Sequence, residues 1–69
     1  MKRRGVNMLR LNFLIEQPDQ NGDVVFTKGK SYLVSKEDEV YYYVYSNKKN
    51  TPPWRFPKFD EGQMFKLIK

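Results

Sequence analysis

Residues 40–45 form an unbroken run of aromatic and β-branched side chains, Val-Tyr-Tyr-Tyr-Val-Tyr. Such side chains fit a pleated, half-buried strand better than a helix. Four other segments alternate apolar and polar residues with a period of two, at residues 9–15, 30–36, 54–56 and 64–69. Five short strands in a chain of 69 residues cannot bury an apolar face as one flat sheet. The sequence therefore predicts an all-β fold in which five strands curl into a small barrel.

Turn-forming residues separate these segments. Residues 16–23 are expected to form a long loop, in which Asn21-Gly22 favours a type I′ turn because both residues accept positive φ. Lys28-Gly29 favours a type II turn, and residues 57–63 a short 3₁₀ turn before the last strand. Alternation along the strands predicts a core made of Leu11, Phe13, Phe26, Tyr32, Val34, Val40, Tyr42, Val44, Phe56, Phe65 and Leu67.

The chain contains neither cysteine nor histidine. It can therefore have no disulfide, no cysteine nucleophile, no histidine base and no ordinary zinc site. Pairs of carboxylates occur only in predicted turns, where exposure to solvent accounts for them: Asp19 with Asp23, Asp38 with Glu39, and Asp60 with Glu61. We expect a protein that is not an enzyme and has no cofactor or metal.

The net charge of +5 is concentrated near the N-terminus. Lys2, Arg3 and Arg4 supply three of the surplus charges, and the remainder from Met8 onward has ten basic and eight acidic residues. Lys-Arg-Arg-Gly can be encoded by a purine run that resembles a bacterial ribosome-binding sequence. We therefore expect residues 1–7 to be either a mis-annotated extension before a natural start at Met8 or a disordered basic arm. Residues 8–69 are expected to form the single β-barrel domain.

No segment has the roughly 20 apolar residues that span a bilayer, and no apolar run of a signal peptide follows the N-terminal basic residues. We expect no membrane association and a cytoplasmic location. The abundance of Lys, Asn, Tyr and Phe fits an AT-rich genome, which suggests a low-GC bacterium or its phage.

Residues 26–34, Phe-Thr-Lys-Gly-Lys-Ser-Tyr-Leu-Val, resemble the diverging turn and second strand of Src-homology-3 domains. The small bacterial and phage Src-homology-3-like barrels share a similar Phe-x-Lys-Gly-x-x-Tyr-x-Val block. A weaker resemblance extends over residues 9–68. The resemblance to this family implies a five-stranded barrel with a short 3₁₀ turn before the last strand. Of the family's peptide-gripping positions, Pro57 is matched, whereas Leu14 and Glu16 replace tyrosines, so the resemblance concerns the fold more than a proline-rich ligand.

Alternation places Tyr41, Tyr43 and Tyr45 on the face of their strand opposite Val40, Tyr42 and Val44. Tyrosines that share an exposed face are typical of protein interfaces. The alternative is that the loop at residues 16–23 covers them.

Trp54 and Phe56 share a face of their strand, with Arg55 opposite. A buried Trp54 would fill the core, whereas an exposed one would anchor an interface, since Trp, Tyr and Arg are common binding hot spots.

We expect a small non-enzymatic module, phage- or prophage-encoded, that docks on a host or viral protein through these aromatic residues and Arg55, and modulates or inhibits it. The alternative is a nucleic-acid-binding barrel that combines the tyrosines with a basic set, Lys48, Lys49, Arg55 and Lys58. Those cations could equally form an ordinary solvated face. The protein is expected to be a monomer, or a homodimer formed through strand edges or the aromatic face.

Overall fold

The computed structural model describes residues 9–68 of the chain. Predictions about residues 1–7 and a start at Met8 lie outside the described residues. The regular secondary structure of these residues is made up of β-strands and one 3₁₀ turn (η1). The order is β1 (Arg10–Phe13), β2 (Gln17–Pro18), β3 (Val24–Phe26), β4 (Ser31–Glu37), β5 (Tyr41–Val44), β6 (Trp54–Pro57), η1 (Lys58–Asp60) and β7 (Phe65–Ile68). The predicted all-β class and the 3₁₀ turn are confirmed, and the predicted strands are placed to within two residues at each end.

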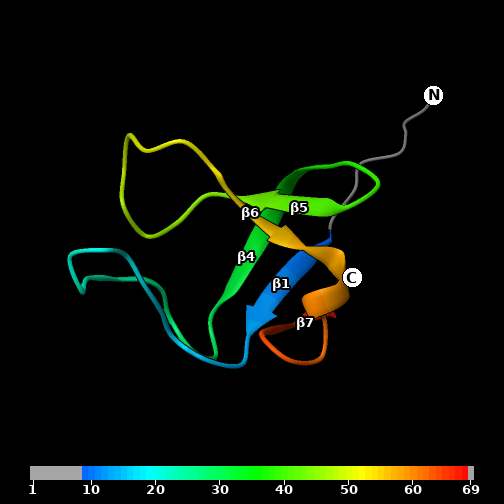
Figure 1. Ribbon diagram of the computed structural model, residues 1–69, viewed down its shortest axis with the longest axis horizontal. Coiled ribbons are helices and arrows are strands. Elements are labelled where there is room, and N and C mark those ends of the chain that lie inside the picture. Colours follow the sequence, from blue (N-terminus) through cyan, green and yellow to red (C-terminus); the bar gives the residue numbers. More distant parts are fainter. Residues whose placement is uncertain (1–8, 69) are drawn as a thin grey trace.

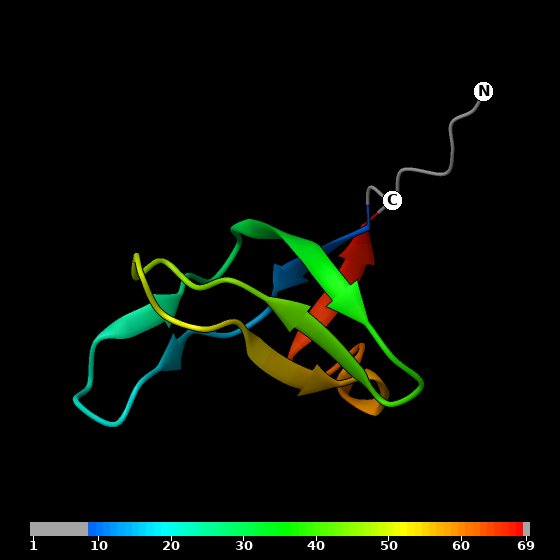
Figure 2. The same cartoon turned by 90° about the horizontal axis from the view of Figure 1, so that it is seen from above.

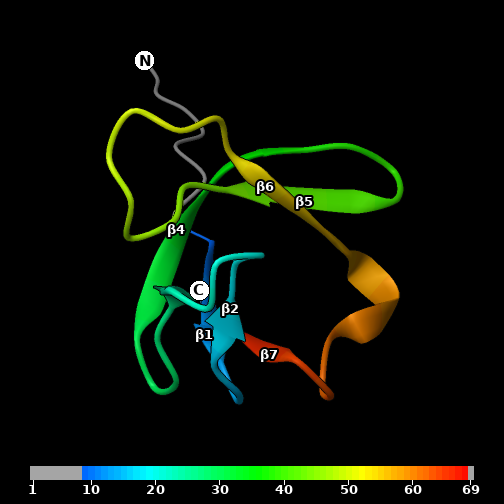
Figure 3. The same ribbon diagram turned by 60° about the vertical axis from the view of Figure 1, so that its left-hand side comes forward.

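Five of the strands form one antiparallel sheet, in the order β6-β5-β4-β1-β7. Strand β4 pairs with β1 through its first half and with β5 through its second half. The register with β5 shifts between Val34 and Lys36, and such a bulge bends a strand and increases its twist. The sheet therefore curls into a half-barrel (Figures 1 and 3). Strands β2 and β3 form a separate hairpin that extends from the barrel.

Phe13 lies at the centre of the core. Its ring centroid is 4.7 Å from that of Phe26, 5.1 Å from Phe56 and 5.5 Å from Tyr32. The contacts are stacked or edge-to-face, which are the favourable geometries for aromatic pairs. Of the eleven predicted core residues, nine are buried: Leu11, Phe13, Phe26, Tyr32, Val34, Tyr42, Val44, Phe56 and Phe65.

The prediction that Val40 belongs to the core is wrong, and the prediction for Leu67 is confirmed only in part. Val40 is 49% exposed because β5 begins only at Tyr41, so the alternation does not extend back to residue 40. Leu67 is half-buried and packs against the edge of the core. Leu9 and Val25 are buried instead. Strand β3 pairs with β2 in an irregular register, which breaks the simple alternation that sequence reasoning assumes.

The turn at residues 19–23 differs from the type I′ turn expected for Asn21-Gly22. Only Gly22 has positive φ, at 87°, and its N–H donates to the carbonyl oxygen of Asp19 at 3.0 Å. The Asp19 side chain organises this turn, as described below. Gly29 has a φ of 84° at the third position of its turn, as a type II turn requires.

Candidate functional site

Tyr41, Tyr43 and Arg55 lie together on the outer surface of β5 and β6, and we call them the tyrosine face. Tyr43 is paired with Arg55 across the two strands, so both side chains are on the same side of the sheet. The ring centroids of Tyr41 and Tyr43 are 6.3 Å apart, and the guanidinium carbon of Arg55 lies 4.8 Å from the Tyr41 centroid. Both rings are half-buried and Arg55 is exposed. The face is accessible, and its members hold one another in place.

Asp38 fixes one end of the tyrosine face. Its Oδ1 accepts hydrogen bonds from the N–H groups of Val40, at 2.8 Å, and Tyr41, at 2.7 Å. Its Oδ2 accepts a hydrogen bond from the Tyr43 hydroxyl at 2.8 Å. The hydrogen bond from the Tyr41 N–H is the main cause of the lowered pKa of Asp38, and the bond to Asp38 raises the pKa of Tyr43. Tyr43 is therefore held as a neutral, oriented phenol.

Lys36 lies beside the tyrosine face, whereas Lys58 lies 5.1 Å from the ring centroid of Tyr42, on the opposite face of β5. The ammonium of Lys36 is 5.5 Å from the Tyr43 ring centroid. Lys58 Nζ pairs with Glu37 Oε2 at 2.7 Å, and this hydrogen bond raises the pKa of Lys58. The surroundings of the tyrosine face thus contain both signs of charge, and the positive charge of Lys58 is compensated.

Tyr45 and Trp54 are not part of this face. Tyr45 follows the last residue of β5 and is 56% exposed. Trp54 is on the inner side of β6, where its ring centroid is 5.7 Å from that of Phe26 and 6.3 Å from that of Phe56. Trp54 is half-buried and packs against the core, so it matches the predicted core role in part. The rest of its side chain is exposed, as the predicted interface role requires.

The open region beside Trp54 is a pocket of about 450 Å³, which we call the hairpin pocket. Its lining residues come from the β2–β3 hairpin, from the loop at residues 45–53 and from the start of β6. The hairpin and the loop extend from the same end of the half-barrel (Figures 1 and 2). Val25 and Trp54 supply its apolar surface. The hairpin contributes polar side chains from Asp19, Gln20 and Asn21, and the loop contributes Ser46, Lys48 and Thr51.

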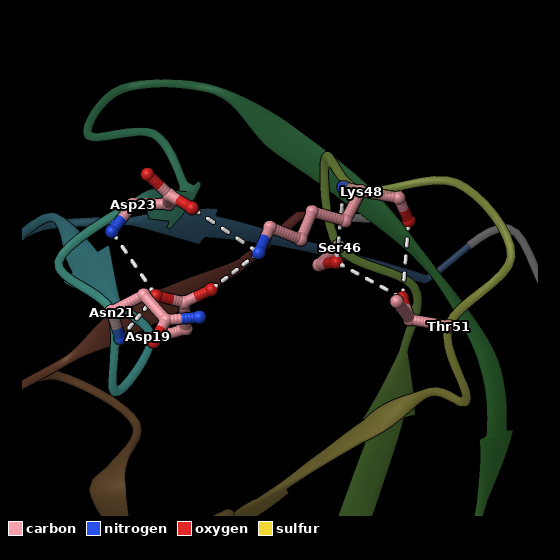
Figure 4. A network of polar contacts seen from close by, with 6 residues as sticks. All are labelled: Asp19, Asn21, Asp23, Ser46, Lys48 and Thr51. Carbon is pink, nitrogen blue, oxygen red and sulfur yellow. Dashed lines mark hydrogen bonds and ion pairs between the residues drawn. The ribbon is translucent and has the colours of Figure 1, made fainter.

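An ion pair joins the two walls of the hairpin pocket (Figure 4). Lys48 Nζ lies 2.6 Å from Asp19 Oδ2 and 3.3 Å from Asp23 Oδ2. Asp19 Oδ1 accepts the N–H groups of Asn21, at 2.8 Å, and Asp23, at 3.1 Å. The hydrogen bond with Lys48 lowers the pKa of Asp19 and raises that of Lys48. The loop at residues 16–23, the alternative cover for the tyrosines, is thus tied to Lys48 through Asp19 and Asp23.

Hydrogen bonds also fix the second wall. The Lys48 N–H donates to Ser46 Oγ at 3.2 Å, and Thr51 Oγ1 donates to the Lys48 carbonyl oxygen at 3.1 Å. The Asn47 N–H donates to the carbonyl oxygen of Val25 at 2.8 Å, which joins the loop to β3. The pocket walls are therefore built before any ligand arrives.

The structure does not bring together the four cations proposed for nucleic-acid binding. Lys48 belongs to the hairpin pocket, and Arg55 belongs to the tyrosine face. Lys58 pairs with Glu37 and contacts the ring of Tyr42. Lys49 is exposed in the loop after Lys48. Sequence reasoning did not identify the hairpin pocket, because its ion pair joins positions that are 29 residues apart. The carboxylate pair Asp19 and Asp23 is the one local sign of the pocket in the sequence, and exposure to solvent in a turn is a sufficient explanation for it until Lys48 is seen to contact both.

Residues 9–68 contain no group of three or more acidic side chains arranged to hold a metal ion. The same residues include no helix long and apolar enough to cross a membrane. Comparisons of the chain with protein-family models, with curated proteins and with solved structures find no match.

Proposed function

We propose that this protein is a non-enzymatic protein-binding module that docks on a partner protein through the tyrosine face. The observation that carries the proposal is the placement of Arg55 over Tyr41, with Tyr43 beside them and tied to Asp38. Tyrosine and arginine are enriched among residues that dominate binding energy. Because these side chains are already held by mutual contacts, a partner would order few of them on binding, which reduces the entropic cost of association.

The strand order β6-β5-β4-β1-β7, with a 3₁₀ turn between β6 and β7, supports the further proposal of a Src-homology-3-like barrel. With the resemblance at residues 26–34, we propose a phage- or prophage-encoded protein that acts in the bacterial cytoplasm. There it would dock on a host or viral protein and modulate or inhibit it.

Nucleic-acid binding is the second candidate, because an arginine stacked on a tyrosine also offers a platform for bases. Ion pairs oppose it: Lys58 and Lys48 already contact carboxylates, which a phosphate would have to displace. Charge-paired lysines release few counterions on binding and contribute little affinity for a polyanion. The docking of a protein is therefore the better supported function.

The test is capture from bacterial lysate on the immobilised protein, with and without nuclease and at low and high salt. Tyr41→Ala combined with Arg55→Ala removes the tyrosine face. The matched control is Leu33→Ala combined with Ile68→Ala, which truncates two exposed apolar side chains elsewhere on the same sheet. We expect a nuclease-resistant, salt-tolerant partner that the first variant loses and the control retains. Capture that nuclease or salt abolishes would instead establish the nucleic-acid function.

A further inference from the structure

We propose that the hairpin pocket is a binding site for a neutral saccharide, with room for one or two sugar rings. It is separate from the tyrosine face and does not depend on the proposed protein docking. Its volume of about 450 Å³ is within the range of roughly 300–1,000 Å³ found for small-molecule sites. The apolar surface of the pocket, its polar rim and its charge balance all suit such a ligand.

Trp54 supplies most of the apolar surface of the hairpin pocket, because Val25 is almost completely buried. Trp54 packs against Phe26 and Phe56, so the core fixes the position of its indole. An indole beside a pocket offers a flat apolar surface. The C–H face of a sugar ring matches such a surface, whereas the ring's hydroxyls require polar partners around it.

The rim of the pocket supplies those partners. Within residues 9–68, the side-chain amides of Gln20 and Asn21 make no hydrogen bond to another residue. Ser46 Oγ accepts the Lys48 N–H and lies 3.5 Å from Thr51 Oγ1. Because Thr51 donates to a carbonyl oxygen, it can only accept from Ser46. Both hydroxyl protons are thus used within the protein, so Ser46 and Thr51 could only accept from a ligand, whereas the two amides can both donate and accept. Such a set of groups suits a polyhydroxylated ligand.

The charge balance disfavours ionic ligands. The ammonium of Lys48 is within 3.3 Å of two carboxylates, so an anion such as phosphate would meet a compensated cation. The same carboxylates hold Lys48, so a cationic ligand would have to displace it. Exchange of a formed ion pair for a new one yields little net free energy. A neutral ligand avoids this competition.

A peptide is also neutral, but the construction of the pocket favours a sugar. Extended peptides are recognised mainly through the free N–H and C=O groups of a sheet edge or through apolar grooves. The rim of the hairpin pocket consists instead of polar side chains gathered from two loops. Such side chains give the directional contacts that distinguish hydroxyl positions.

The chain has a single tryptophan, so the fluorescence of Trp54 reports directly on the pocket. The protein is titrated with triacetylchitotriose, cellotriose and maltotriose, and two-dimensional ¹⁵N NMR spectra monitor the side-chain amides of Gln20 and Asn21. We expect at least one sugar to cause saturable changes in both signals, with a dissociation constant on the order of 1 mM.

Gln20→Ala and Asn21→Ala should each weaken that binding about 2- to 10-fold, the equivalent of one neutral hydrogen bond. Both residues are exposed, and Asn21 is not among the residues with positive φ, so these variants should fold. Gln63→Ala is the matched control, because it removes an exposed amide from a turn outside the pocket and should bind like the wild type.

Three results would overturn the saccharide proposal. The first is the absence of any change with all three sugars at their highest soluble concentrations. The second is a sugar response that the control variant loses as strongly as the pocket variants. The third is a response of Trp54 and the two amides to a neutral proline-rich peptide or to inorganic phosphate, but to no sugar. None of these results bears on the tyrosine face, which the capture experiment tests separately.

Discussion

The hydroxyl of Tyr32 donates a hydrogen bond to Oδ1 of Asn47 at 2.9 Å. Tyr32 is a buried residue of β4, and Asn47 lies in the loop that forms one wall of the hairpin pocket. The same hydroxyl accepts the N–H of Thr27 at 2.8 Å, and Asn47 Nδ2 donates to Thr27 Oγ1 at 3.0 Å. A polar link thus joins the aromatic core to both walls of the pocket.

Tyr32→Phe should destabilise the fold by about 1–2 kcal/mol, because it keeps the buried ring but leaves the partly buried N–H of Thr27 without its acceptor. It also removes one of the two donors to Asn47 Oδ1, since Lys30 Nζ is the other. The expected fall in Tm is about 4–8 °C for each kcal/mol in a domain of this size. Thermal unfolding followed by circular dichroism measures it. An unchanged Tm would mean that water replaces the hydroxyl at no cost.

Phe13→Ala should unfold the protein at room temperature. Truncation of a buried phenylalanine costs about 3–5 kcal/mol, which is about the whole stability expected of a domain of this length. Phe59→Ala is the matched control, because Phe59 is 77% exposed and its truncation should change stability by less than about 0.5 kcal/mol. Urea unfolding of both variants distinguishes the two. A folded Phe13→Ala variant would contradict the central role of this ring.

Lowering the pH should destabilise the protein through Asp19 and Asp38. Both have folded-state pKa values below the ordinary value of an aspartate, Asp19 through its hydrogen bond with Lys48 and Asp38 through the backbone N–H groups of Tyr41 and Val40. A carboxyl with a depressed folded pKa contributes stability that is present above the unfolded pKa and lost as the pH falls through the folded pKa. The loss should therefore begin near pH 4 and continue below it.

Carboxyl-detected NMR titration tests the two causes separately. Lys48→Met should raise the pKa of Asp19 and leave that of Asp38 unchanged, since the Asp38 shift arises mainly from the N–H groups of Tyr41 and Val40. Equal shifts of both carboxyls would show that general charge, rather than the ion pair, sets the pKa of Asp19.

Gly29→Ala should destabilise the fold by about 1–2 kcal/mol. Gly29 has a φ of 84°, and in this left-handed region the Cβ of an alanine comes too close to its own backbone. Apart from Gly29 and its two chain neighbours, no residue has an atom within 4 Å of the position of an added Cβ, so the penalty is conformational and does not come from crowding. Gly29→Asn should cost less, because asparagine tolerates this region. Equal losses for the two variants in urea unfolding would contradict this explanation.

The sequence by itself determined the five strands of the main sheet and most of their inward faces, but not the β2–β3 hairpin, of which β2 lies in a segment predicted as a loop. Side-chain alternation is a local property of extended backbone, so Phe13, Tyr42 and Val44 could be assigned to the core without knowledge of strand pairing. The same reasoning placed Arg55 opposite Trp54. It failed at Val40 and Val25, where a turn and an irregular hairpin interrupt the alternation.

Only the tertiary structure decided which of these faces come together. The bulge near Ser35 bends β4 between its two neighbours and so curls the sheet, and the pairing of β5 with β6 brings Arg55 over Tyr41. The hairpin pocket depends on contacts such as Lys48 with Asp19, across 29 residues of sequence. Contacts of this kind form when the folded sheet brings distant loops together, and no short segment of the chain encodes them.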